Sequence, residues 1–221
     1  MMPRSVNVFI TGGTGYVGRH LIPALLGRGH RVRALARETA LARVPAGAQA
    51  VVGDALDADS VAAALRPDDT VIHLVGTPHP SPAKAKQFEE IDLASIRATV
   101  NAARRVGIGH LVYVSVAQPA PVMRAYLRVR GLGETMIKEA GFTATILRPW
   151  YVLGPGHRWP IALLPFYKIA ECFLSTRDSA EHLGLVTIDQ MASALLHAVE
   201  NPPDQGRIRI FDVPAIRRAG T

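Results

Sequence analysis

The sequence predicts an α/β fold in which a doubly wound parallel sheet lies between two layers of helices. Short runs rich in Val, Ile and Leu alternate along the chain with longer segments of helical character. A glycine-rich turn joins the first of these runs to the first helical segment. Strands that alternate with helices form βαβ units, whose right-handed crossovers give a parallel sheet with both faces covered. The length of 221 residues suits one domain over residues 1–221.

Seven apolar runs are the expected strands, because polar residues, glycine or proline bound each of them. They are residues 6–10, 31–36, 50–52, 70–74, 111–115, 143–147 and 208–213. Between the first six runs, residues 19–28, 60–65 and 87–106 favour helix. The last of these segments carries apolar residues at helical spacing, which predicts that one of its faces packs on the sheet. These apolar residues are Phe88, Ile91, Ile96, Val100 and Ala103.

The composition excludes several classes of protein. Hydrophobic residues make up 48% and charged residues 19% of the chain, which is typical of a globular domain and excludes intrinsic disorder. The formal net charge is +7, from 25 Lys and Arg against 18 Asp and Glu. The basic residues are spread along the chain without a long run, so nucleic-acid binding is disfavoured. A small molecule that carries phosphate is the partner that better fits this charge.

The same reading favours a cytoplasmic protein without a membrane span. The single cysteine, Cys172, excludes an intramolecular disulfide and fits a reducing compartment. The most apolar later stretch, residues 161–174, is interrupted by Pro165, Lys168 and Glu171. A membrane-spanning helix needs about 20 apolar residues, so this stretch is too short and too interrupted. The apolar stretch near the N-terminus is likewise too short for the core of a signal peptide.

A glycine loop, Thr11-Gly-Gly-Thr-Gly-Tyr-Val-Gly18, directly follows the first predicted strand and opens a helix. It contains both T-G-x-x-G-x-x-G and G-x-G-x-x-G, the fingerprint of a Rossmann fold. Glycines allow the tight turn and let backbone N–H groups approach a pyrophosphate, while the helix N-terminus favours negative charge. We therefore expect a dinucleotide here, with a purely structural turn as the alternative. The residues expected to bind it are Gly12, Thr14, Gly15, Tyr16, Val17 and Gly18.

The end of the second predicted strand indicates which dinucleotide binds. The fingerprint expects an acidic residue about 20 positions after the glycines, where it holds the ribose 2′-hydroxyl of NAD. Here Arg37 stands at that strand end, with Glu38 directly after it. A cation at this place suits the 2′-phosphate of NADP, so we predict NADP, with NAD held by Glu38 as the alternative. A further alternative is that Arg37 is a solvated residue at the end of a strand and has no part in binding the cofactor.

Acidic residues also follow the third predicted strand. Asp54, with Ala55 after it, stands where a carboxylate accepts a hydrogen bond from the adenine amino group. Asp54 as a plain turn residue is the alternative. Asp57 or Asp59 is expected to cap the helix over residues 60–65, because an aspartate before a helix accepts from its first N–H groups.

Together these residues resemble the short-chain dehydrogenase/reductase superfamily, in particular its extended and atypical NAD(P)-binding members, which are epimerase/dehydratase-like and NmrA-like. The parts of the chain that carry the resemblance are residues 11–18, Asp54, 73–76, 111–115, Tyr126, Arg148, Pro149 and 186–192. The resemblance implies that the cofactor is lined by the turn after the fourth strand, and that the segment from Pro149 to Val152 closes over the nicotinamide. The lining residues are Leu74, Val75 and Gly76.

The chemistry of this superfamily rests on a serine, a tyrosine and a lysine four residues after the tyrosine. Ser115 and Tyr126 match the first two, but Arg130 stands in the place of the lysine. An arginine supplies the same charge through a bulkier planar group, so cofactor binding is expected regardless and catalysis depends on this exchange. The structural alternatives are that Ser115 only completes a strand end, and that Tyr126 and Arg130 form a structural pair one helical turn apart.

We therefore predict an NADP-dependent oxidoreductase that transfers hydride between the nicotinamide and a small carbonyl or quinone-like substrate, with Tyr126 as acid and base. The first alternative is a redox sensor or assembly protein that binds NAD(P) without turnover. The second is an epimerase or dehydratase, disfavoured because only about 70 residues follow Pro149.

The remaining expectations concern the substrate side and the partners. Residues 150–185 are expected to form a lid over the substrate, in which His157 and Trp159 contact the substrate or belong to a rigid surface loop. The eight histidines show no metal-binding spacing, so no metal is expected. The expected partners are a small-molecule substrate and, at most, a second copy of the chain.

Overall fold

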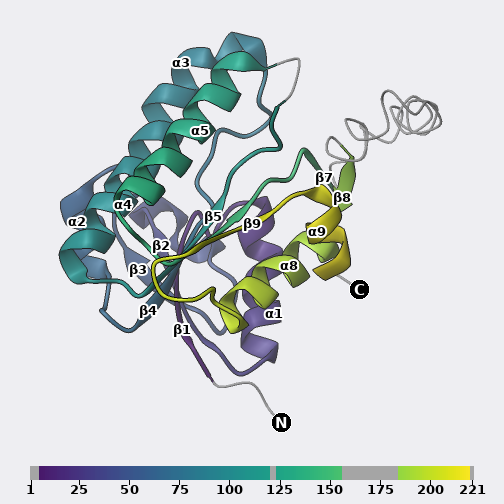
Figure 1. Cartoon of the computed structure of the whole chain (residues 1–221). Helices are drawn as coiled ribbons and strands as arrows, with labels where there is room; N and C mark the ends of the chain where they lie inside the picture. The colour runs from purple at the N-terminus through teal and green to yellow at the C-terminus, as the bar shows by residue number, and fades with distance from the viewer. Residues whose placement is uncertain (1–4, 120–122, 156–183, 220–221) are drawn as a thin grey trace.

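The computed structural model describes residues 5–119, 123–155 and 184–219, and within them seven parallel strands form one sheet (Figure 1). The strands are β1 (Asn7–Thr11), β2 (Arg31–Ala36), β3 (Gln49–Val52), β4 (Asp69–His73), β5 (His110–Val114), β6 (Ala144–Leu147) and β9 (Ile208–Phe211). Their order, β3-β2-β1-β4-β5-β6-β9, reverses between β1 and β4. The doubly wound sheet predicted from the sequence is confirmed. A separate parallel pair joins β7 (Tyr151–Leu153) to β8 (Leu185–Thr187).

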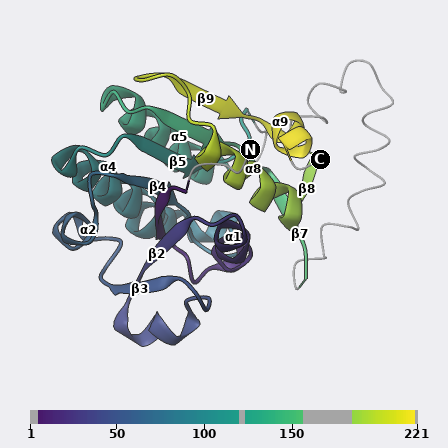
Figure 2. The ribbon, with the colours of Figure 1, turned by 90° about the horizontal axis from the view of Figure 1, so that it is seen from below.

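Helices cover both faces of the sheet (Figures 1 and 2). One face carries α1 (Tyr16–Gly27), α8 (Ile188–Glu200) and α9 (Val213–Ala219). The other carries α2 (Ala58–Ala64), α4 (Ala94–Val106) and α5 (Arg124–Glu139), with the short α3 (Ala85–Gln87) leading towards α4. Successive side chains of a strand point to opposite faces, so Val8 and Ile10 of β1 join the core under α1 while Phe9 joins the core under α4. The three-layer arrangement follows from this alternation.

The helix predicted over residues 87–106 is present but is not one regular α-helix. A π-helical turn, Phe88–Leu93, precedes α4 and contains the buried Asp92. Two residues of the predicted apolar face, Phe88 and Ile96, are fully buried; Ile96 lies in the core under α4, whereas Phe88 packs on the Tyr126 ring of α5. The expected cap of α2 is Asp57, whose carboxylate accepts hydrogen bonds at the start of that helix. No helix in the described ranges is long and apolar enough to cross a bilayer.

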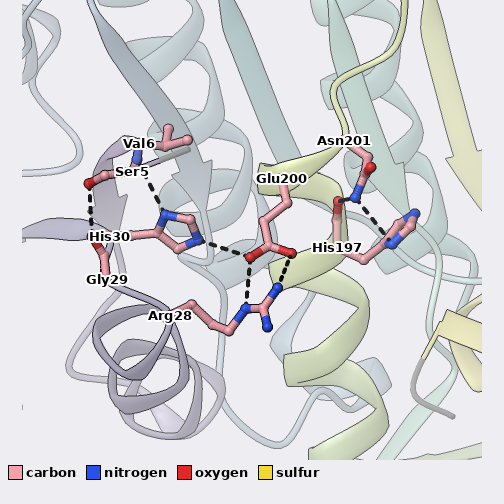
Figure 3. Close-up of polar contacts among 8 residues, drawn as sticks. All are labelled: Ser5, Val6, Arg28, Gly29, His30, His197, Glu200 and Asn201. Atoms are coloured by element: carbon pink, nitrogen blue, oxygen red, sulfur yellow. Dashed lines mark hydrogen bonds and ion pairs between the residues drawn. The ribbon is translucent and has the colours of Figure 1, made fainter. Parts of the chain in front are cut away.

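Ion pairs join separate elements at the edge of the sheet at which the strands begin. Figure 3 shows Glu200, from the last turn of α8, between Arg28 and His30 at the end of α1. Arg28 Nε donates to Glu200 Oε1 at 2.9 Å, and His30 Nε2 lies 3.4 Å from the same oxygen. His30 Nδ1 accepts from the N–H of Val6, just before β1, at 3.3 Å. The end of α1, the end of α8 and the start of β1 are therefore tied together.

A second ion pair at this amino edge is buried. Arg33 Nη2 of β2 lies 2.5 Å from Asp69 Oδ2 of β4, with side-chain exposures of 11% and 0%. Arg33 Nη1 also donates to the carbonyl of Ala64 at 2.7 Å, and the N–H of Arg66 donates to Asp69 at 2.7 Å. The pair therefore joins β2 and β4 to the end of α2. Burial raises the pKa of the Asp69 carboxyl, although Arg33 opposes this shift.

Candidate functional site

The glycine loop lies at the opposite edge of the sheet, where the strands end. Gly12 has a φ of +79°, and a Cβ on it would lie 2.8 Å from the backbone of Leu74 and Val75. Both observations require glycine at this position. A Cβ on Gly18 would lie 2.5 Å from the carbonyl oxygen of Gly13, so α1 packs directly on the turn. The predicted cofactor residues of the loop and of the turn after β4 are therefore in contact.

The start of α1 has the properties of an anion-binding helix terminus. Gly15 is the N-cap, its backbone is extended, and no side chain of the described residues caps the helix. The first turn of α1 holds no acidic residue, so no side chain of that turn opposes the binding of an anion to the N–H groups of Tyr16 and Val17. A Cβ on Gly15 would approach only the carbonyl of Gly12, at 3.1 Å. This open, uncapped terminus fits a pyrophosphate.

Tyr16 links the glycine loop to the segment after β7. Its phenol oxygen occupies the space that a Cβ on Gly154 would need. Burial raises the pKa of Tyr16, which therefore stays neutral at physiological pH. Val152 lies in β7, two residues before Gly154, and the carbonyl of Pro149 accepts from the N–H of Ala117 at 2.9 Å. The predicted nicotinamide-side residues thus belong to the carboxyl edge as well.

The predicted residues for the adenosine end follow β2 and β3, which are neighbours in the sheet. Arg37 and Glu38 are both exposed directly after β2. Asp54 and Ala55 follow β3, and the Asp54 carboxylate accepts from the N–H of Leu56 at 2.9 Å. That contact is the one expected of a turn residue. Because the ends of neighbouring parallel strands adjoin, all four residues lie beside the glycine loop on one side.

Ser115 lies on the other side of the loop, at the end of β5. Its buried hydroxyl donates to Glu134 Oε1 of α5 at 2.5 Å. Glu134 also accepts from Gln118 Nε2 and from Arg148 Nε, each at 3.0 Å. The Ser115 proton is therefore directed towards Glu134, and the oxygen remains able to accept a hydrogen bond. The carboxylate of Glu134 is held by Arg148 at the end of β6.

Tyr126 and Arg130 lie one turn apart on α5. Tyr126 is half-buried and packs on Phe88, with 4.9 Å between the ring centroids. The guanidinium carbon of Arg130 lies 5.2 Å from the centroid of the Tyr126 ring. Arg130 itself is buried, where Nη2 donates to Asp92 Oδ1 at 2.7 Å and Nη1 donates to the carbonyl of Val114 at 3.0 Å. Arg130 therefore connects Tyr126 to the residue before Ser115.

His73, the last residue of β4, is fully buried below the glycine loop. Its Nδ1 lies 2.9 Å from Thr11 Oγ1 and 3.0 Å from Thr99 Oγ1. Burial lowers the pKa of His73 to about 3, and the positive charge of Arg130 adds to this effect. A fully buried histidine with so low a pKa stays neutral at physiological pH, and its hydrogen bond to Thr11 supports the loop.

Sequence reasoning missed Glu134 and Asp92 as members of the site, and it named Arg148 for the family resemblance without giving it a role. One signal was present, because Tyr126, Arg130 and Glu134 recur at intervals of four and so share one face of a helix. The predicted lid over residues 150–185 falls mostly outside the described ranges, and so do His157, Trp159 and Cys172. In the part of the chain that is described, no three His, Cys, Asp or Glu side chains are grouped to hold a metal ion.

Comparison with known protein families adds to what the geometry of the site indicates. A family described as NAD(P)H-binding matches residues 12–158. Among curated proteins, the chain is similar to a ceramide reductase of Caulobacter vibrioides, 26% identical over 93% of this chain and 64% of that protein. It is also similar to a chloroplastic divinyl chlorophyllide a 8-vinyl-reductase of Oryza sativa subsp. indica, 31% identical over 67% of this chain and 40% of that protein. The chain thus spans less than two thirds of the length of these relatives.

Solved structures share the fold. A short-chain dehydrogenase/reductase superfamily protein from Agrobacterium tumefaciens, solved with bound NAD, has a TM-score of 0.67 at 19% identity, over 96% of this chain and 81% of that one. A UDP-N-acetylglucosamine 4-epimerase from Bacillus cereus also has a TM-score of 0.67, at 17% identity, over 94% of this chain and 79% of that one. The resemblance inferred from the sequence is confirmed at the level of this fold and of NAD(P) binding.

Proposed function

Because this chain belongs to the family of NAD(P)H-binding proteins, we propose that it is an oxidoreductase that transfers hydride between NADP(H) and a small carbonyl or quinone-like substrate. One observation carries the proposal. The uncapped start of α1, with the open space at Gly15, lies at the same edge of the sheet as Ser115 and Tyr126. Reductases among the relatives of this chain support the same class of reaction.

The chain's own residues divide the binding of the cofactor among them. Backbone N–H groups of the glycine loop hold the pyrophosphate, and Arg37 meets the 2′-phosphate, which favours NADP over NAD. If Glu38 faces the ribose in its place, the preference reverses. The adenine side is formed by Asp54 and Ala55. Leu74, Val75 and Gly76 line the cofactor, and Pro149 and Val152 form the nicotinamide side.

Bound NADPH would supply the hydride. Tyr126 delivers the proton to the substrate oxygen, and the guanidinium of Arg130, 5.2 Å from the ring centroid, stabilises the negative charge left on the phenol. Ser115 orients the substrate through its hydroxyl oxygen, because its own proton is directed to Glu134. Tyr126 is half-buried, so part of its side chain is open to the surroundings, as the proposed role in proton transfer needs.

Calorimetric titration with NADPH and with NADH, followed by a panel of carbonyl and quinone substrates, tests this proposal. We expect tighter binding of NADPH and oxidation of NADPH with at least one member of the panel. Binding of neither cofactor would refute the proposal. Tighter binding of NADH would change the cofactor to NAD and make Glu38 the selecting residue.

A second candidate function is an NAD(P) sensor or assembly protein without turnover. One observation favours it, because Arg130 replaces the lysine of the superfamily and its guanidinium is held in a buried ion pair with Asp92. The same substrate panel separates the two functions. Cofactor binding without oxidation of NADPH by any substrate supports the sensor.

A further inference from the structure

The ion pair between Arg130 and Asp92 is buried beside the candidate site, with side-chain exposures of 6% and 0%. Removing two charges from water is costly, so such a pair persists only where further hydrogen bonds satisfy both groups. Asp92 Oδ2 accepts from both the N–H and the hydroxyl of Thr77, at 2.9 Å and 2.6 Å. Arg130 Nη1 donates to the carbonyl of Val114 at 3.0 Å. The pair therefore joins α5, the end of β5, the π-helical turn and the segment after β4.

The segment after β4 is shaped around this pair. The guanidinium of Arg130 occupies the space that a Cβ on Gly76 would need, since that Cβ would overlap Nη2. Thr77, the next residue, is buried and bound to Asp92 through two hydrogen bonds. The turn is therefore held at both residues, because Gly76 packs against Arg130 and Thr77 is hydrogen-bonded to Asp92.

The same turn is continuous with the glycine loop. The backbone of Leu74 and Val75 lies so close to Gly12 that a Cβ there would approach it to 2.8 Å. The N–H of Leu74 also donates to the carbonyl of Thr11 at 2.9 Å. A displacement of Gly76 would therefore be transmitted within two residues to the backbone that packs on the glycine loop.

We propose that Arg130 and Asp92 form a positioning pair, which fixes the Gly76–Thr77 turn and through it the shape of the cofactor site. This inference rests on the proposed function for the identity of the ligand. Arginine is required because its two amino groups reach Val114 and Asp92 at the same time in one plane. The single nitrogen of a lysine is too compact to hold both partners and to fill the space against the turn. Besides its contact with the Tyr126 ring, Arg130 thus acts on the cofactor site through the protein's own backbone and not by contact with the cofactor.

Two substitutions in the site and one matched control test the proposal. Arg130→Lys keeps the charge but loses the two-pronged contact. Thr77→Val removes one hydrogen bond to Asp92 and leaves the ion pair intact, so it remains informative if the first variant does not fold. The control is Arg33→Lys at the amino edge, where the arginine also contacts a buried aspartate and a backbone carbonyl. Both lysine variants lose a similar set of contacts, but only Arg130 adjoins the cofactor turn.

Two measurements on the full chain decide the outcome. The first is the Kd of NADPH and NADH, at a temperature where each variant is folded, and the second is hydrogen exchange at the Thr77 amide. Arg130→Lys should weaken cofactor binding and speed exchange, each about 10-fold, the equivalent of one lost charged hydrogen bond. Thr77→Val should produce a smaller change of about 3-fold in cofactor Kd. Arg33→Lys should leave both quantities within about 2-fold, although it lowers stability.

The proposal is overturned if Arg130→Lys leaves both quantities unchanged, or if Arg33→Lys weakens cofactor binding equally. It is also overturned if Thr77 exchanges faster while the Kd stays the same, because the turn would then be held without effect on the site. If the unaltered chain binds neither NADPH nor NADH, the proposed function fails. In that case hydrogen exchange alone tests the positioning pair. Unchanged exchange of the Thr77 amide in Arg130→Lys would overturn the pair as well, whereas faster exchange would support the effect of the pair on the turn.

Discussion

The two edges of the sheet carry similar ion pairs that serve different purposes. At the amino edge, Arg33 with Asp69, and Glu200 with Arg28 and His30 (Figure 3), join strands and helices that are far apart in sequence. At the carboxyl edge, Arg130 with Asp92 holds a turn beside an uncapped helix terminus. The amino-edge pairs lie away from the predicted site residues, whereas the carboxyl-edge pair packs against Gly76. Changes at the first should therefore alter stability, and changes at the second should alter binding and turnover.

The largest effect on function without an effect on stability is expected for a substitution at Tyr126. Tyr126→Phe keeps the ring that packs on Phe88 and removes only the hydroxyl. Turnover should fall by about 10²–10⁴, the usual contribution of a positioned acid or base. The affinity for NADPH should stay within a few fold. Steady-state kinetics on a substrate found in the panel would measure turnover, and calorimetric titration would measure the affinity for NADPH. Full turnover in this variant would make Tyr126 a structural residue.

Acid should lower the unfolding free energy of the chain through two buried histidines, one at each edge of the sheet. Burial lowers the pKa of His73, at the carboxyl end of β4, to about 3 and that of His110, at the amino end of β5, to about 4. The unfolded chain binds protons at these histidines near pH 6.5, so stability is fully present above that pH and is lost as the pH falls. From pH 7 to pH 5, each histidine should cost about 2 kcal/mol of unfolding free energy.

Urea unfolding at pH 7 and pH 5 measures this loss. His110→Asn should remove about half of the pH dependence, since His73 remains to titrate. Equal unfolding free energies at the two pH values would contradict the assignment of both histidines as neutral in the folded state.

The next effect concerns the choice of cofactor. Arg37→Ala should weaken NADPH binding by about 1.5–3 kcal/mol, typical of a charged hydrogen bond, and leave NADH nearly unchanged. Arg31→Ala provides a matched control, because Arg31 is an exposed arginine at the amino end of the same strand. Calorimetric titration of both variants is the measurement. If Arg37→Ala weakens the two cofactors equally, the NADP assignment is wrong.

The smallest effect is expected at the amino edge. Glu200→Gln weakens the contacts to Arg28 and His30, but the Arg28 side chain is 48% exposed, so solvent screens that ion pair. The unfolding free energy should fall by about 1 kcal/mol or less, and the difference should shrink in high salt. The Kd of NADPH should not change. A loss of cofactor affinity in this variant would break the distinction between the two edges.

Local patterns explain why the fold was predictable. Each strand is a short apolar run, and alternation along β1 places Val8 and Phe9 in different cores. The glycine loop was equally readable, because Gly12 combines a positive φ with a backbone contact that only glycine allows. Each of these features is set by residues that are close together in the sequence, so it can be recognised from a single sequence.

The interior of the site was not predictable in the same way. Asp92 and Glu134 are acidic residues on helical segments, and such residues ordinarily face solvent. Asp92 is buried against Arg130 and Glu134 is partly buried against Arg148, and both arginines come from other elements of the fold. The spacing of Tyr126 and Arg130 indicated a shared helix face. It did not indicate that the guanidinium turns inward to an aspartate 38 positions away.

The central claim is that the glycine loop binds the cofactor, and Gly15→Val tests it most directly. The space around Gly15 is open apart from the carbonyl of Gly12, so a valine should be tolerated by the fold while it blocks the pyrophosphate. Gly109→Val, in open space before β5, is the matched control. Calorimetry should show NADPH binding to the unaltered chain and to Gly109→Val, and a loss of about 100-fold or more in Gly15→Val with unchanged unfolding. Equal NADPH affinity in Gly15→Val would contradict this site.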